Sequence, residues 1–229
     1  MKYKKVIHGR FNKRVNRFIA EVFINGVKER VHIKNTGRLD ELLRPNIEVL
    51  LEKSDNPKRK TKYSLIAVNK NSRWINIDSQ APHTVIYETL KTGALPEFAN
   101  VRYVKREVMY RDSRFDLYVE TDDKRGFIEV KGVTLAKNGI AMFPDAPTTR
   151  GVKHVLELIE AMREGYSAAV VFIVQMKGCW TFTPHAEIDQ KFSNTLWDAS
   201  QQGVKILAYD TIVKADELRL NKALPVYLP

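Results

Sequence analysis

Two apolar segments that flank a short polar turn constrain the fold of this chain most. Residues 114–120 and 126–130 have the composition of β-strands, so they are expected to pair as a hairpin. Asp116 lies in the first strand and Glu129 in the second, and pairing of the strands can bring the two carboxylates together. Glu129 and Lys131 are two residues apart, so they point to the same face of the strand.

Two carboxylates and an ammonium group on one face are what metal-dependent phosphodiester hydrolysis needs. We predict that Asp116 and Glu129 hold Mg²⁺ or Mn²⁺, and that Lys131 orients the attacking water or offsets charge on the phosphate. The alternative is a surface hairpin with charges at alternate positions. Apolar neighbours favour a buried hairpin, in which charges are costly unless they are paired or bind metal. These neighbours are Phe115, Leu117, Val119, Phe127, Ile128 and Val130.

The net charge of +11 is confined to the first third of the chain. Residues 1–80 carry 19 Lys and Arg against 8 Asp and Glu, whereas residues 81–229 carry 19 of each. Such an asymmetry predicts one module that binds a polyanion, in particular a nucleic acid, and a second module with another task. Solubility, or the Lys and Glu preference of thermophiles, is the alternative explanation.

The remaining composition excludes several classes of protein. The chain has no apolar run of membrane-spanning length and no secretory signal, so we expect a cytoplasmic protein without a membrane partner. Its single cysteine, Cys179, excludes an internal disulfide framework and a cysteine-based zinc site. The oligomeric state is left open, with a homodimer as one option.

The first part of the chain is rich in short strands. Five are predicted, at residues 18–24, 27–33, 47–51, 63–68 and 74–77. The first two flank Asn25-Gly26, a strong hairpin signal, and a short helix is expected at residues 39–43. Five strands of this length favour a small closed barrel of the OB type, which binds nucleic acid on one face, although an SH3-like barrel is not excluded.

A predicted helix at residues 82–90 begins the second part, which divides the chain into domains 1–81 and 82–229. Strands follow at residues 101–108, 114–120, 126–130, 140–143, 168–174 and 204–209. Thr148 or Thr149 is expected to cap a helix that ends near Gly165, and a further helix is expected over residues 188–202. Antiparallel strands followed by alternating helices and strands predict an α/β sheet with helices on its faces.

Two basic stretches of the first part are candidate nucleic-acid contacts. Asn35, Thr36 and Arg38 surround a glycine turn that suits phosphate contact, or the turn simply caps a helix. Arg59 and Lys60 lie in a basic run near an aromatic residue, a pattern that tracks a nucleic-acid backbone or forms a solvated loop.

In the second part, Arg150 and His154 are four residues apart on a predicted helix and therefore share a face. A structural role is expected for His154. Glu107 is a candidate for a further metal ligand.

Six stretches of the chain resemble the sugar fermentation stimulation protein A family. They are His32-x-x-Asn35-Thr36-Gly37-Arg38, Arg59-Lys60-Thr61, Lys105-Arg106-Glu107, Ser113-Arg114-Phe115-Asp116, Glu129-Val130-Lys131-Gly132-Val133-Thr134-Leu135 and Phe143-Pro144-Asp145-Ala146-Pro147-Thr148-x-Arg150-Gly151-x-x-His154. One departure is His83, where the resemblance leads us to expect Asn after Pro82.

The order of elements also resembles the PD-(D/E)xK nuclease fold of restriction endonucleases and Holliday-junction resolvases. The two resemblances imply an N-terminal five-stranded OB-like barrel, a nuclease-like α/β domain with a central mixed sheet, and DNA binding. In such a fold Arg150 would hold the scissile phosphate, Arg114 would lie in a nucleic-acid-binding motif, and Glu88 would compete with Glu107 as the further acidic ligand.

Two functions of different classes follow from these features. The first is a metal-dependent nuclease that binds single- or double-stranded DNA, which the presence of Asp116, Glu129 and Lys131 together favours. The second is a DNA-binding regulator without turnover, because the family name reflects a proposed role in sugar (maltose) metabolism. Absence of a helix-turn-helix signal speaks against a conventional repressor. Single-stranded RNA is a weaker candidate ligand.

Overall fold

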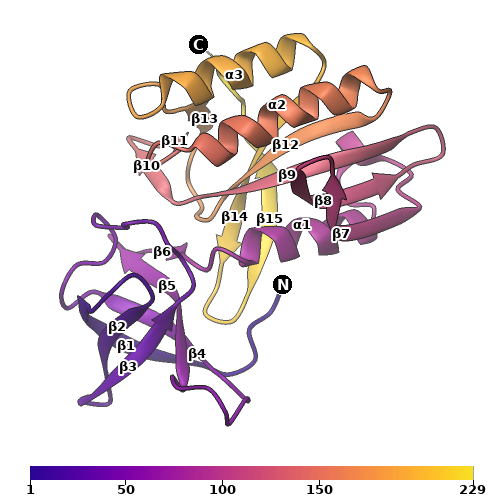
Figure 1. Ribbon diagram of the computed structural model, residues 1–229. Coiled ribbons are helices and arrows are strands. Elements are labelled where there is room, and N and C mark those ends of the chain that lie inside the picture. Colours follow the sequence, from indigo (N-terminus) through magenta and orange to yellow (C-terminus); the bar gives the residue numbers. More distant parts are fainter. Residues whose placement is uncertain (229) are drawn as a thin grey trace. The chain divides into compact units, whose positions relative to one another are not determined.

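The structure, a computed structural model, describes residues 1–228 and divides into two units (Figure 1). The first unit contains Met1–Ala81 together with Gln175–Lys177 and Thr211–Arg219, and the second unit contains the other described residues. Among residues 1–228, no helix is long and apolar enough to cross a membrane.

The first unit is built on a closed barrel of five strands. They are β1 (Val6–Arg14), β2 (Ile19–Ile24), β3 (Val27–Ile33), β4 (Glu48–Lys53) and β5 (Tyr63–Lys70). Antiparallel pairing runs in the order β3-β2-β1-β4-β5, and β3 then pairs with β5 in parallel at His32↔Ser64 and Ile33↔Leu65. Because this last pairing joins the two ends of the sheet, the predicted OB-like barrel is confirmed.

The strands that form the ring differ in part from those expected. β1 was not predicted, because its charged residues interrupt the apolar pattern and only Gly9 and Phe11 are buried. β6 (Arg73–Asn76) was predicted as a barrel strand but pairs only with β5 in the ring. The helix expected at residues 39–43 was wrong. Leu39 has a φ of 55°, and its carbonyl accepts bonds from Leu42 and Leu43 in an isolated turn whose leucines are buried.

A central mixed sheet, as predicted, forms most of the second unit, and its strand order is β15-β14-β12-β9-β8-β7. Its strands are β7 (Tyr103–Tyr110), β8 (Ser113–Glu120), β9 (Arg125–Val133), β12 (Ser167–Val174), β14 (Lys205–Val213) and β15 (Leu218–Ala223). β7, β8 and β9 are antiparallel neighbours, whereas β12 lies parallel to both β9 and β14. A small second sheet contains β10 (Leu135–Lys137), β11 (Ile140–Phe143) and β13 (Thr181–Pro184). β10, β13 and β15 were not predicted.

Helices cover both faces of the central sheet (Figure 1). α1 (Ala81–Lys91) places Ile86 and Leu90 in a core with Leu117 and Ile128 of the sheet. α2 (Thr149–Arg163) packs on the other face against β8, β9 and β12, and α3 (Gln190–Gln201) packs against α2 and β13. A short 3₁₀ helix, η1 (Pro96–Phe98), follows α1.

The starts of α2 and α3 are tied together by one carboxylate. Thr148 caps α2 by accepting a bond from the Gly151 amide at 3.0 Å, as one of the two predicted caps. Asp189 caps α3 through Oδ1, which accepts from the Phe192 amide, while its Oδ2 accepts from the Thr148 amide at 2.7 Å. The first turn of α2 is therefore anchored from outside the helix, which matters because that turn carries Arg150 and the next turn carries His154.

A glycine at the β9–β12 pairing supplies a test of this sheet. A Cβ on Gly126 would lie 2.0 Å from Ser167 Oγ and 2.5 Å from the Ser167 carbonyl oxygen. Since the carbonyl cannot rotate away, Gly126→Ala should lower the stability of the sheet by about 1–3 kcal/mol, the usual cost of overpacking. Thermal unfolding measures this loss. Ser167→Ala in the same background should not restore it, and a Gly126→Ala protein that melts like wild type would contradict the close approach.

Candidate active site

The β8–β9 hairpin brings together the two predicted acids. Its register pairs Leu117 with Ile128, so Asp116 lies one residue before this pair on β8 and Glu129 one residue after it on β9. The Val130 amide donates to Asp116 Oδ2 at 2.8 Å, so the Asp116 side chain is held against the neighbouring strand. Residues on both strands are buried as expected, and the hairpin is an interior part of the sheet.

Glu129 is the most enclosed charged group of this hairpin. Its side chain is 3% exposed, and Oε1 accepts bonds from Lys131 Nζ at 2.6 Å and from His154 Nδ1 at 2.5 Å. The contact with Lys131 confirms that the two residues share a face. Oε2 is also buried, but it has no hydrogen-bond partner among the described residues. An unsatisfied buried oxygen costs about 1–3 kcal/mol, so Oε2 is suited to a cation.

Asp116 is paired with a histidine whose contact was not foreseen. Asp116 Oδ1 lies 3.2 Å from Nε2 of His83, which α1 carries over this hairpin. Burial alone would raise the pKa of Asp116, but the bond and charge of His83, the Val130 amide and Lys131 hold that pKa below its ordinary value. Burial likewise lowers the pKa of His83, but Asp116 and Glu129 outweigh it and raise that pKa. No pattern around Pro82 indicated that this helix face meets β8.

The donor set fits an ion that keeps part of its water shell. Within residues 1–228, no three His, Cys, Asp or Glu side chains are grouped so that they could hold a metal by themselves. Mg²⁺ usually keeps several waters and binds through one or two carboxylates plus substrate phosphates. Asp116, which is partly exposed, and the unpartnered Oε2 of Glu129 supply such carboxylates.

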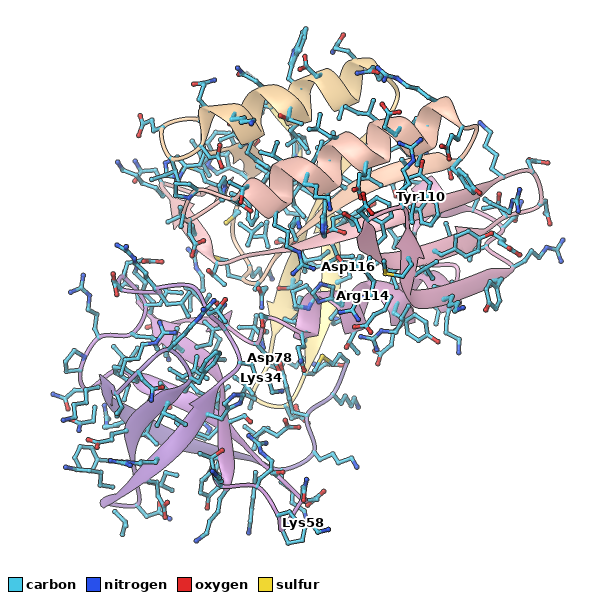
Figure 2. The ribbon with its side chains drawn as sticks, viewed as in Figure 1. Lys34, Lys58, Asp78, Tyr110, Arg114 and Asp116 are labelled. Carbon is cyan, nitrogen blue, oxygen red and sulfur yellow. The ribbon has the colours of Figure 1, made fainter. Side chains whose placement is uncertain are left out.

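The other candidate ligands lie at the surface. Glu107 on β7 has a 65% exposed side chain that pairs with Arg114 Nη1 at 3.6 Å, and its φ is 54°. Arg114 and Asp116, both labelled in Figure 2, are two residues apart on β8. Glu88 is exposed on α1. Metal ligation by Glu88 or Glu107 stays a prediction.

Arg150 and His154 contact each other on α2, as their spacing indicated. Arg150 Nε donates to His154 Nε2 at 3.3 Å, and the His154 side chain is 5% exposed. Phe115 packs edge-on against the His154 ring at 6.1 Å between centroids. The bond from His154 to Glu129 joins residues that are 25 positions apart, so no local sequence pattern predicts it.

The glycine turn of the first unit is organised by an arginine that we did not single out. The Arg14 guanidinium donates to the carbonyls of Asn35, Gly37 and Arg38 at 2.6–3.1 Å. Asn35 Oδ1 accepts from the Gly37 amide at 2.8 Å, so this amide is already used within the turn, and no helix follows it. Thr36 and Arg38 are exposed.

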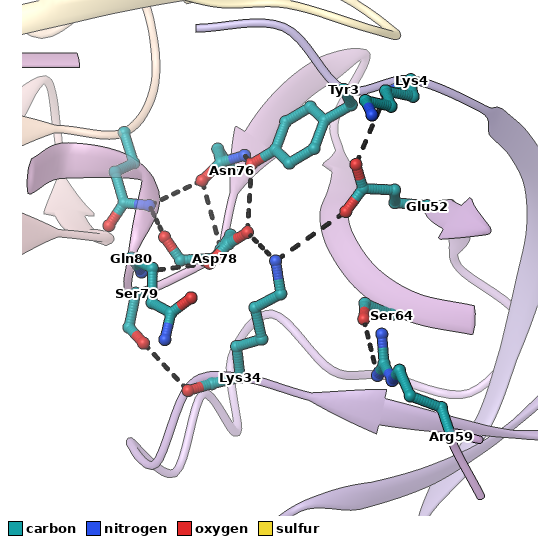
Figure 3. A network of polar contacts seen from close by, with 11 residues as sticks. Tyr3, Lys4, Lys34, Glu52, Arg59, Ser64, Asn76, Asp78, Ser79 and Gln80 are labelled. Carbon is teal, nitrogen blue, oxygen red and sulfur yellow. Dashed lines mark hydrogen bonds and ion pairs between the residues drawn. The ribbon is translucent and has the colours of Figure 1, made fainter. Parts of the chain in front are cut away.

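The basic run before β5 has two kinds of residue. Arg59 Nη2 donates to Ser64 Oγ at 3.1 Å and Thr61 Oγ1 at 3.3 Å, which ties its side chain to the barrel (Figure 3). Lys58 and Lys60 on either side are exposed, and Figure 2 shows Lys58 at the edge of the first unit. These two lysines are therefore free to meet a polyanion.

A buried carboxylate in the first unit was missed by sequence reasoning. Asp78 is fully buried and accepts a bond from Lys34 Nζ at 2.6 Å and a longer one from the Tyr3 hydroxyl (Figure 3). Asn76 donates to the same hydroxyl, and Gln175 donates to Asn76. Burial and the charge of Asp78 raise the pKa of Tyr3. Because Lys34 neutralises Asp78, we assign this network a structural role.

Family models and similar proteins all point to the same family. The family model described as the sugar fermentation stimulation protein RE domain matches residues 80–217, and the SfsA N-terminal OB domain matches residues 13–77. A sugar fermentation stimulation protein homolog of Alkaliphilus oremlandii is 53% identical over 226 residues, 96% of each chain. A homolog of Clostridium beijerinckii is 50% identical over 228 residues, 100% of each chain.

A solved structure is also similar over almost the whole chain. It is described as the structure of Pyrococcus furiosus SfsA in complex with Ca²⁺. The TM-score is 0.92 and the sequence identity is 31%, with 99% of this chain and 98% of that chain covered.

The His83–Asp116 pair predicts a defined pH dependence of stability. Because the pKa of His83 is raised, the pair contributes stability that is fully present below pH 6.5, the ordinary pKa of histidine. This contribution is lost as the pH rises through the folded-state pKa. Because the pKa of Asp116 is lowered, the pair contributes stability that is fully present above pH 3.8, the ordinary pKa of aspartate. This contribution is lost as the pH falls through the folded-state pKa. His83→Gln keeps an amide near Asp116 but does not titrate. Wild type should therefore melt above this variant between these two pH values, and the difference should shrink above neutral pH.

Melting temperatures of both proteins across this pH range provide the measurement. Asp122→Asn, which alters an exposed pair with Arg102, serves as the control and should show no comparable window. An identical difference between wild type and His83→Gln in mild acid and in mild alkali would show that the pair does not titrate as described.

Proposed function

The chain belongs to the sugar fermentation stimulation protein family, and from that premise we propose that it binds DNA and cleaves phosphodiester bonds with the help of Mg²⁺ or Mn²⁺. The observation that carries this proposal is the unpartnered Glu129 Oε2, with Lys131 bonded to the other oxygen of Glu129 and Asp116 bonded to the backbone of the adjacent Val130. The Pyrococcus furiosus structure, described as a complex with Ca²⁺, supports a divalent ion, since Ca²⁺ also takes oxygen ligands.

Each residue of the site has a role in this chemistry. Asp116 and Glu129 would hold the ion, which supplies Lewis-acid activation of the phosphate and a more acidic bound water. Lys131 stays bonded to Glu129 Oε1 and presents positive charge on the same face, where it offsets charge that develops on the phosphate. The exposed guanidinium groups of Arg114 and Arg150 suit contact with the neighbouring phosphates.

The first unit would supply most of the DNA affinity. It contains all of residues 1–80, which hold the whole charge excess. Its exposed Thr36, Arg38, Lys58 and Lys60 are free to meet a phosphate backbone. Contacts of this kind read charge and not base sequence, so we infer binding that is largely independent of sequence.

One observation favours the second candidate, a DNA-binding regulator without turnover. Both acids already have cationic neighbours in the protein, His83 for Asp116 and Lys131 for Glu129. If these neighbours neutralise the acids permanently, the site is structural. Catalysis and regulation then differ in whether an ion competes successfully for the two carboxylates.

Replacement of Asp116 separates these candidates. Wild type should take up Mn²⁺ in a calorimetric titration and cleave at least one member of a panel of single-stranded, duplex and branched DNA. Asp116→Asn should lose both properties but bind DNA as before, because the charge excess lies in the other unit. Lys131→Ala should cleave about 10²-fold more slowly at an Mn²⁺ concentration that saturates the site. Asp122→Asn is the matched control on an exposed turn and should behave as wild type.

A wild-type protein that binds DNA but neither takes up Mn²⁺ nor cleaves any member of the panel would leave the regulator as the function. Mn²⁺ binding by Asp116→Asn at the wild-type affinity would show that Asp116 is not a ligand.

The charge of the first unit predicts a steep salt dependence of DNA binding. If about five phosphates are contacted, the logarithm of the binding constant should fall with that of salt concentration at a slope of roughly −4 to −5. Joint replacement of Lys58 and Lys60 by Ala should reduce the slope by about two. Joint replacement of the exposed Lys137 and Lys191 in the second unit should leave it nearly unchanged. Fluorescence anisotropy at several salt concentrations measures these slopes, and a flat dependence would refute the proposed electrostatic contact.

A further inference from the structure

We propose that Arg150 and His154 are positioning residues that hold the Glu129 carboxylate so that one of its oxygens can face a bound metal ion. The inference deepens the proposed function, on which it rests for the identity of the ligand. It starts from three contacts in the second unit: Arg150 Nε to His154 Nε2 at 3.3 Å, His154 Nδ1 to Glu129 Oε1 at 2.5 Å, and Lys131 Nζ to the same Oε1 at 2.6 Å.

The contact with Arg150 fixes the tautomer of His154. A guanidinium group only donates hydrogen bonds, so His154 Nε2 must be the acceptor and carries no proton. The ring proton then lies on Nδ1, which donates it to Glu129 Oε1. Without Arg150, only the Glu129 carboxylate favours the proton on Nδ1, and the Nε2 tautomer, which cannot donate to Glu129, gains population. Arg150 therefore acts on Glu129 through His154.

The two donors on Oε1 orient the whole carboxylate. Rotation of the Glu129 carboxylate to another orientation would break the bonds to both Lys131 and His154. The buried Oε2 consequently stays without a protein partner and is available to a cation. Outer residues that hold a ligating group in this way typically change metal affinity by 10–100-fold when they are removed.

The surrounding packing keeps His154 in place. Thr148 and Asp189 anchor the first turn of α2, and the Phe115 ring contacts the imidazole edge-on. A Cβ on Gly151 would lie 2.8 Å from the Thr148 side chain, so this turn is tightly packed. The start of α2 is therefore held in place independently of His154. Replacement of His154 consequently tests its hydrogen bond to Glu129 and not the position of the helix.

Metal affinity of four variants tests this assignment. His154→Asn places an amide nitrogen near the position of Nδ1, whereas His154→Gln places its amide near Nε2. Mn²⁺ titration should show most of the wild-type affinity for His154→Asn, but a loss of about 10–100-fold for His154→Gln and for Arg150→Met. Val155→Ala, a buried change on the next residue of α2, is the control for simple destabilisation and should bind Mn²⁺ as wild type does.

A second readout does not depend on metal. Nitrogen-15 spectra of the five histidines should show His154 protonated at Nδ1 in wild type and a shift toward the Nε2 tautomer in Arg150→Met. The spectrum of His154→Asn identifies the signal. An unchanged tautomer in Arg150→Met, or equal Mn²⁺ affinities of His154→Asn and His154→Gln, would overturn the inference. If the tautomer responds to Arg150→Met but wild type takes up no Mn²⁺, the proposed metal chemistry fails and the positioning chain stands.

Discussion

The burial of one carboxylate, that of Glu129, is the constraint around which the second unit is arranged. A charge in the interior of a sheet is costly unless it is compensated. Compensation comes from two side chains: Lys131 on the same strand and His154 on α2. Only one of the two Glu129 oxygens is satisfied by these contacts, and the other marks the point where an ion would complete the charge balance.

The two units treat their charges in different ways. In the first unit the buried Asp78 is neutralised within the barrel by Lys34 and bonded by Tyr3, whereas most of the basic excess remains at the surface. Residues 81–229 carry equal numbers of positive and negative side chains, yet a few of these charges are buried within the sheet of the second unit. Charge at the surface attracts a polyanion over a long range, whereas charge enclosed away from water interacts strongly with charge that develops during a reaction. This division agrees with capture of DNA by one unit and a reaction in the other.

His83 shows how the protein can carry two carboxylates near each other without metal. Its raised pKa and the lowered pKa of Asp116 describe the same attraction from its two ends. With Lys131 beside Glu129, each acid has a cationic neighbour. Under the proposed function, an ion that enters this site would compete with side chains that are already in place, and the balance between them would decide whether the site turns over substrate.

The sequence by itself determined the β8–β9 hairpin, its Asp and ExK residues, the barrel, the mixed sheet and most helix limits, because each depends on local periodicity, turn residues and caps. It did not reveal β1, whose charged residues conceal its alternation, or the turn at Leu39, which buried leucines hold in place of a helix. Only the tertiary structure decided that His83 meets Asp116 and that Arg150 and His154 reach Glu129. The contacts with Asp116 and Glu129 join residues from separate elements. They depend on how each helix is rotated on the sheet that it covers, which the spacing of residues along the chain does not predict.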